Sequence, residues 1–199
     1  MKNVTSDNMQ LNIREVIDFA FKKHAGQKRP NKTKELKTIH LTEVVKWVEQ
    51  ANGNIFAITA AYLHDTIEDT QTTTQEIIDT FGAQVGLLVE ELTDPDEFYS
   101  LALSIRKEKQ AQRIQKSHPS TKLVKIADQI SNCYSVLNDP PIDWDNAKCL
   151  EYITGAKKIV DACSGTNEYL ENNFIQPRRK TPSFRAGMQA DQTFRFAIK

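Results

Sequence analysis

Apolar residues recur at helical spacing along most of the chain. The first stripe runs from Ile13 to Phe21 at three- and four-residue steps and ends at Gly26, which predicts an amphipathic helix. A second helix is expected from about Thr42 to Ala51. The third, from Asn54 to about Asp65, is apolar on nearly every face, so we expect it at the centre of a helical bundle.

The later part of the chain follows the same rule. Thr73 and Glu76 have the spacing of a capping box, which predicts a short helix that Gly82 ends. Ser120 is a candidate cap for a long helix that Asp139 and two prolines end. Other helices are expected near 85–92, 101–116, 143–162 and 167–174. No hairpin motif or repeat is present, so we predict an all-α fold with a single domain.

Composition narrows the class of partner. The chain has 26 basic and 26 acidic residues, so no net field draws it to nucleic acid or to a membrane. Basic residues collect in 176–199, which we interpret as a C-terminal extension to a domain spanning 1–175. The three cysteines show no C-x-x-C spacing, and the N-terminus lacks an apolar signal core. We therefore expect a cytoplasmic protein without disulfides.

Candidate chemistry is concentrated where the apolar third helix ends. His64, Asp65, Glu68 and Asp69 lie within six residues there. If the helix continues through this point, His64 and Glu68 share one face at a spacing of four. Taken alone, a buried histidine paired with an aspartate, followed by a solvated helix end, explains the same pattern.

Two further positions change that balance. Asp128 interrupts an apolar stripe, with Asn132 one turn later, and His40 is expected just before the second helix. A carboxylate in an apolar setting needs a partner, and a cation shared with His64 and Asp65 would supply it. Two imidazoles and two carboxylates suit a divalent transition-metal ion that activates water. Glu68 is then a candidate to orient that water.

The order His…His-Asp…Asp resembles the HD phosphohydrolases. The stretches Leu63–Thr70, Phe81-Gly82, Val89–Asp94 and Lys122–Asp128 are similar to the hydrolase domain of the RelA/SpoT family. Glu151-Tyr152 and Gly165–Asn167 resemble its small stand-alone alarmone hydrolases, including the metazoan type. The resemblance covers roughly residues 24–173.

This resemblance implies an HD-domain helical bundle and a specific activity. One Mn²⁺ ion would be held by His40, His64, Asp65 and Asp128. The reaction would be hydrolysis of the 3′-pyrophosphate of ppGpp or pppGpp, giving GDP or GTP and pyrophosphate. Glu68 and Asp69 match the catalytic acidic pair of the family. The expected substrate-binding residues are Arg29, Asn132, Lys107 and Tyr152.

The chain departs from the family pattern between Arg29 and His40. It has Arg29-Pro30, Leu36-Lys37-Thr38-Ile39 and His40-Leu41 where the family commonly has a second basic residue, a Gly-x-Pro-Tyr-Ile turn and His-Pro. The base of the substrate therefore stays open. Alternatives are another nucleotide, such as ppApp or the 2′-phosphate of NADPH, and a non-catalytic alarmone-binding module. A homo-oligomer is also left open.

Overall fold

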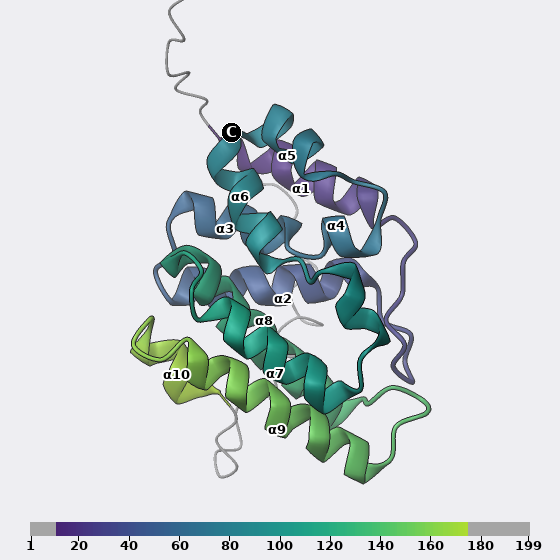
Figure 1. Cartoon of the computed structure of the whole chain (residues 1–199). Helices are drawn as coiled ribbons and strands as arrows, with labels where there is room; N and C mark the ends of the chain where they lie inside the picture. The colour runs from purple at the N-terminus through teal and green to yellow at the C-terminus, as the bar shows by residue number, and fades with distance from the viewer. Residues whose placement is uncertain (1–10, 175–199) are drawn as a thin grey trace, which may run out of the picture.

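The computed structural model describes residues 11–174, and that part of the chain is built from helices (Figure 1). In chain order these are α1 (Ile13–Lys23), α2 (Lys37–Gln50), α3 (Ile55–Leu63), α4 (Thr66–Asp69), α5 (Thr74–Phe81), α6 (Ala83–Leu92), the 3-10 turn η1 (Asp96–Ser100), α7 (Leu103–Ile114), α8 (Pro119–Asn138), α9 (Asn146–Ala162) and α10 (Glu168–Asn173). Extended pairing in this range is limited to two isolated bridges, Lys28 with Leu36 and Asn31 with Pro141. The predicted all-α fold is confirmed.

Helix α3 is the centre of the bundle, as its apolar sequence predicts. It packs against α1, α2, α6 and α8. Ala57, Ala60, Ala61 and Leu63 are fully or almost fully buried on it. Small alanine side chains let neighbouring backbones come close, and this brings α2 and α8 to the C-terminal end of α3. The functional side chains gather there.

A second layer of helices covers the other side of α8. In Figure 1, α7 and α9 run alongside one another below α8, and α10 follows α9 at one edge. Close packing of α7 and α9 depends on Gly155, because a Cβ at this position would lie 2.6 Å from Cγ of Lys107. The glycine therefore makes room for the Lys107 side chain between the two helices.

One predicted helix start and one predicted cap are wrong, and the third helix is interrupted. Helix α3 ends at Leu63, close to the predicted end, and His64 and Asp65 form a turn before α4, so the helix does not continue unbroken from His64 to Glu68. Helix α2 begins at Lys37, which places His40 inside its first turn. Helix α8 is capped by the His118 ring, which accepts from the amide of Ser120 at 3.1 Å, so Ser120 is not the cap.

The capping box before α5 is confirmed in one of its two bonds, since Thr73 Oγ1 accepts from the amide of Glu76 at 3.1 Å. The basic extension at 176–199 and the domain end at 175 lie outside the described residues and stay predictions. Within the described range, no helix combines the length and the apolar character needed to cross a bilayer.

Candidate metal centre and active site

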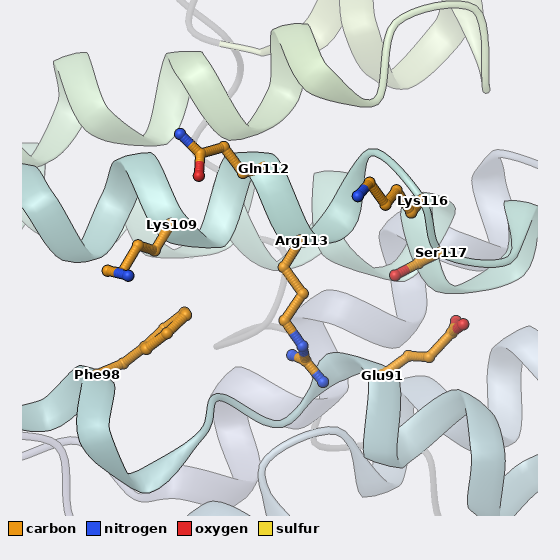
Figure 2. A pocket seen from close by; sticks show the side chains of 7 residues that line it. All are labelled: Glu91, Phe98, Lys109, Gln112, Arg113, Lys116 and Ser117. Atoms are coloured by element: carbon orange, nitrogen blue, oxygen red, sulfur yellow. The ribbon is translucent and has the colours of Figure 1, made fainter.

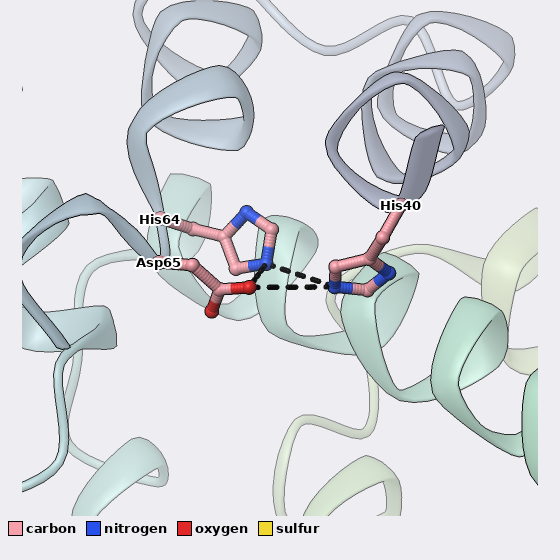
Figure 3. A group of neighbouring side chains, drawn as sticks. All are labelled: His40, His64 and Asp65. Carbon is pink, nitrogen blue, oxygen red and sulfur yellow. Dashed lines mark hydrogen bonds and ion pairs between the residues drawn. The ribbon is translucent and has the colours of Figure 1, made fainter. Parts of the chain in front are cut away.

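Three helical segments bring four ligand atoms to one point. His40 projects from the first turn of α2, His64 and Asp65 follow α3, and Asp128 lies in the middle of α8 (Figure 3 shows the first three). The two Nε2 atoms are 3.2 Å apart. Asp65 Oδ2 is 3.2 Å from His64 Nε2 and 3.6 Å from His40 Nε2. Asp128 Oδ1 is 3.4 Å from His40 Nε2 and 3.7 Å from His64 Nε2.

These separations fit a metal ion. Ligand atoms bonded at about 2.1 Å to one ion lie roughly 3.0–3.5 Å from each other in octahedral or tetrahedral geometry. The three distances among the His40, His64 and Asp65 atoms are 3.2–3.6 Å, which is close to this range, and Asp128 Oδ1 approaches the two imidazole nitrogens from α8 at 3.4 and 3.7 Å. The predicted ligand set is thus brought together, and its residue types suit a divalent transition-metal ion.

The hydrogen bonds of the two Nδ1 atoms, which lie on the far side of each ring from the cluster, explain why a positive charge is favoured between the two rings. His64 Nδ1 must carry a proton, because its partner at 2.8 Å is the carbonyl oxygen of Ala61, which only accepts. His40 Nδ1 lies 2.9 Å from Ser131 Oγ, whose own proton goes to Glu43. In the neutral form, both rings therefore point an Nε2 lone pair at the other. Two lone pairs at 3.2 Å repel unless a proton or a metal ion lies near them.

Neighbouring charges and burial shift the pKa values of three members of the cluster. Burial and the charge of Arg29 lower the pKa of His40 to about 3, so this ring stays neutral. Burial also disfavours a charged His64, but attraction to Asp65 and Asp128 raises its pKa overall. Burial would raise the pKa of Asp65, but nearby His64 and Lys37 hold it well below its usual value. The carboxylates thus favour a positive charge at His64 Nε2, the atom that faces the other ligands.

The expected catalytic pair lies on the single turn of α4, but its two carboxylates differ. Glu68 Oε1 accepts from the amide of Asp94 at 2.5 Å, and burial raises the pKa of Glu68 to about 7. Asp69 is bound by Lys37, whose Nζ lies 2.6 Å from Asp69 Oδ2. Glu68 is therefore able to take up a proton near neutral pH, whereas Asp69 has a cationic partner.

The expected substrate-binding residues fall into two pairs beside Asp128. Arg29 Nη2 donates to Asn132 Oδ1 at 2.6 Å, and Asn132 Nδ2 donates to Asp128 Oδ1 at 2.5 Å. Lys107 Nζ lies 4.1 Å from the centre of the Tyr152 ring. Lys107 is only 4% exposed, and burial together with the charge of Lys125 lowers its pKa to about 8. Cationic groups therefore surround the carboxylate ligand.

Several residues at this site were not expected from the sequence. Lys37 Nζ lies 2.5 Å from Asp65 Oδ2 as well as contacting Asp69. It precedes His40 by three residues, a spacing that places both on one face of a helix. With the helix expected to begin at about Thr42, Lys37 and His40 both lay outside it, so their spacing could not be interpreted as a shared face. Buried Glu43 and Ser131 were missed because neither resembles a metal ligand in its position.

A groove of about 510 Å³ lies apart from this cluster, between η1, the end of α6 and α7 (Figure 2). It is lined by Glu91, Phe98, Lys109, Gln112, Arg113, Lys116 and Ser117. Arg113 already donates to the carbonyl oxygens of Thr93 and Glu90, and Glu91 accepts from the amide of His118 and from Thr121. These two charged side chains hold α6, α7 and α8 together.

Comparison with known proteins gives consistent matches. Residues 17–143 match the model of the HD domain family. The chain is 37% identical over 164 residues to the mouse guanosine-3′,5′-bis(diphosphate) 3′-pyrophosphohydrolase MESH1, covering 81% of this chain and 90% of the mouse protein. It is also 37% identical over 159 residues to the human protein of that name, covering 79% and 87% of the two chains.

Solved structures show the same fold. A metazoan ortholog of SpoT that hydrolyses ppGpp superimposes with a TM-score of 0.76 at 29% sequence identity, over 85% of this chain and 94% of the other. A second structure, lmo0812 from Listeria monocytogenes, has a TM-score of 0.55 at 21% identity over 67% of this chain and 88% of the other. At that identity the likeness concerns the fold alone.

Proposed function

This chain belongs to the HD-domain family and, within it, to the group of MESH1 pyrophosphohydrolases, and we propose that it hydrolyses the 3′-pyrophosphate of guanosine alarmones such as ppGpp. The observation that carries the proposal is a cluster in which the Nε2 atoms of His40 and His64 lie 3.2 Å apart and each lies 3.2–3.7 Å from one carboxylate oxygen of Asp65 and one of Asp128. Relatives that share this chain over most of their length carry that activity in their names.

We assign the ion as Mn²⁺, one per site, held by His40, His64, Asp65 and Asp128. When bound, a divalent ion lowers the pKa of a bound water and polarises a phosphoryl oxygen. The mixed histidine and carboxylate ligands support a transition-metal ion over Mg²⁺ or Ca²⁺, which prefer oxygen ligands. The choice of Mn²⁺ among such ions follows from the family resemblance.

Residues of the chain account for the proton transfers. Water attacks the phosphorus attached to the ribose 3′-oxygen, and Glu68 takes the proton that the water loses. The bond from phosphorus to the 3′-oxygen breaks, and the proton passes to that oxygen, so ppGpp and water give GDP and pyrophosphate. Asp69, held by Lys37, keeps the turn of α4 in place beside Glu68.

Binding of the charged substrate is assigned to the residues around Asp128. Arg29 and Lys107 supply positive charge for the pyrophosphate, and Asn132 supplies an amide beside the ligand. Tyr152 offers an aromatic face, with Lys107 on one side at 4.1 Å. Arg106 and Lys125 add charge nearby, since both repel a charged Lys107. Excess cations stabilise the charge that develops on the departing diphosphate.

A product assay tests the proposal. Chelator-treated protein, supplied with Mn²⁺ and ppGpp, should release pyrophosphate and GDP, identified by mass. Asp128→Ala should lose Mn²⁺ binding and turnover together. Glu68→Gln should keep Mn²⁺ binding but lower turnover by about 100-fold or more. If the metal-loaded wild type leaves both ppGpp and ppApp intact, the proposal is wrong. Orthophosphate released from NADPH would instead identify a 2′-phosphatase.

A further inference from the structure

The outer nitrogen of His40 ends a chain of buried hydrogen bonds. His40 Nδ1 lies 2.9 Å from Ser131 Oγ, and Ser131 Oγ lies 2.8 Å from Glu43 Oε2. The three residues are 1%, 2% and 7% exposed, respectively. His40 and Glu43 are one turn apart on α2, and Ser131 is one turn after Asp128 on α8. The chain of bonds therefore joins the two helices that supply His40 and Asp128.

The direction of these bonds decides which nitrogen of His40 carries its proton. An ionised carboxylate only accepts, so Ser131 donates its one hydroxyl proton to Glu43. The Ser131 oxygen is then left to accept, and His40 Nδ1 must donate to it. The lone pair of a neutral His40 is consequently on Nε2, the atom that faces His64 Nε2 and both aspartates.

A carboxylate at the far end of such a chain also strengthens the ligand. Charge-assisted hydrogen bonds are stronger than neutral ones, so the Glu43 charge polarises the Ser131 hydroxyl and, through it, the imidazole. Outer-shell partners of this kind fix the ring orientation and raise the basicity of the ligating nitrogen. His64 has a weaker arrangement, because its Nδ1 donates to the neutral carbonyl of Ala61 at 2.8 Å.

We propose that Glu43 and Ser131 are positioning residues that set the tautomer of His40 and thereby raise the affinity of the centre for its divalent ion. The inference rests on the metal part of the proposed function and does not depend on the identity of the substrate. Glu43 is hydrogen-bonded to Ser131 and acts on His40 through it.

The Mn²⁺ affinities of four variants test the role of the hydrogen bonds from Glu43 through Ser131 to His40. Mn²⁺ binding to chelator-treated protein, followed by electron paramagnetic resonance, should weaken by about 10- to 100-fold in Ser131→Ala. Glu43→Leu should weaken it by a similar factor, because the freed hydroxyl can donate to His40 Nδ1 and favour the wrong tautomer. Glu43→Gln keeps an accepting oxygen but not the charge, so it should bind Mn²⁺ more tightly than Glu43→Leu and less tightly than the wild type. Ser135→Ala, the same change one turn along the buried side of α8, is the matched control and should bind as the wild type does.

A double variant and a spectroscopic probe separate positioning from general damage. Ser131→Ala with Glu43→Leu should be no weaker than either alone, because both interrupt one chain. Visible absorption of Co²⁺ bound in place of Mn²⁺ should change in Ser131→Ala and not in Ser135→Ala, since His40 would turn within the ligand set.

Equal affinities for Ser131→Ala and Ser135→Ala, or no recovery in Glu43→Gln, would overturn the inference. Wild-type protein that binds neither Mn²⁺ nor Co²⁺ would overturn it together with the metal part of the proposed function. If the variants show the expected order of Mn²⁺ affinities but the protein leaves ppGpp intact, the role of Glu43 and Ser131 is supported and only the proposed substrate is wrong.

Discussion

Lys37 places a permanent positive charge beside a metal ligand. Its Nζ lies 2.5 Å from Asp65 Oδ2, the same oxygen that approaches both imidazoles, and 2.6 Å from Asp69 Oδ2. Burial disfavours a charged lysine, but attraction to Asp65 and Asp69 raises the pKa of Lys37 above its usual value. The ammonium group is therefore charged at neutral pH and must influence any cation bound at Asp65.

Replacing Lys37 should affect metal binding and turnover in opposite directions. In Lys37→Met we expect Mn²⁺ to bind at least about tenfold more tightly, because like charges about 4 Å apart repel by a few kcal/mol in a partly buried setting and tenfold corresponds to only about 1.4 kcal/mol. Turnover of ppGpp should fall, because Asp69 loses the partner that holds it. Mn²⁺ titration and steady-state kinetics measure the two effects. Lys32→Met, an exposed change in the preceding loop, is the control. Weaker Mn²⁺ binding in Lys37→Met would contradict this role.

We expect ionised, buried Glu68 to lower the free energy of unfolding of the protein. Burial raises its pKa from 4.5 to about 7, so between these values the folded state binds more protons than the unfolded state. The free energy of unfolding therefore falls as pH rises through this window, and the whole penalty is present above pH 7. A glutamine of the same shape carries no such penalty and can still accept from the amide of Asp94.

Glu68→Gln should accordingly be more stable than the wild type at pH 8, by on the order of 2 kcal/mol, and equally stable near pH 4. Urea unfolding of chelator-treated protein across this range measures the difference. Glu151→Gln, on an exposed position of α9, should show no comparable pH-dependent gain. A constant difference between Glu68→Gln and the wild type at all pH values would show that Glu68 does not titrate in this window.

Helices with an apolar stripe could be predicted from sequence, whereas turns fixed by tertiary contacts could not. In α1 the residues of the apolar stripe are close in sequence, and in α5 the capping Thr73 is three residues from the amide that it caps, so local sequence determines both features. Helix α2 has no capping side chain, because the residue before it is Leu36, and the sequence therefore does not show where this helix begins. The sequence also gives no sign of the break after α3, since His64 keeps helical backbone angles although the helix has ended.

The candidate site shows the same division. His40, His64, Asp65 and Asp128 could be listed from residue type and order, and the structure brings them together. Ser131 could not, because a serine in an apolar stripe gains its meaning only when α2 places His40 opposite it, 91 positions away in sequence. Partners that are distant in sequence and chemically ordinary leave no local signal.

Packing between α7 and α9 offers a test at the scale of elements. In a helix, Ala is favoured over Gly by roughly 1 kcal/mol, so Gly155→Ala would stabilise an isolated α9. In the folded protein the new Cβ would lie 2.6 Å and 2.7 Å from Cγ and Cβ of Lys107, atoms next to the α7 backbone that have little freedom to move. We expect a net loss of about 1 kcal/mol or more by urea unfolding.

The same change should disturb the site, because Lys107 donates to Gln129 at 3.1 Å, and Gln129 donates to Asp128 at 2.8 Å. The Michaelis constant for ppGpp should therefore rise in Gly155→Ala. Thr154→Ala, at an exposed neighbouring position, should be neutral in both measurements. Unchanged stability of Gly155→Ala would mean that α7 and α9 separate more easily than their packing indicates.

At the scale of the whole molecule, the ion should act as a link between distant parts of the chain. Its proposed ligands come from α2, from the turn after α3 and from α8, and these segments meet only in the folded state. An ion that binds the folded state alone stabilises it by about 2.7 kcal/mol at a concentration 100 times its dissociation constant. For a chain of this length the midpoint of thermal unfolding should rise by about 5–10 °C. Scanning calorimetry with Mn²⁺ and with chelator measures this rise, which Asp128→Ala should abolish and exposed Asp143→Ala should leave intact. Equal midpoints for the wild type in Mn²⁺ and in chelator would mean that these four residues hold the fold together without an ion.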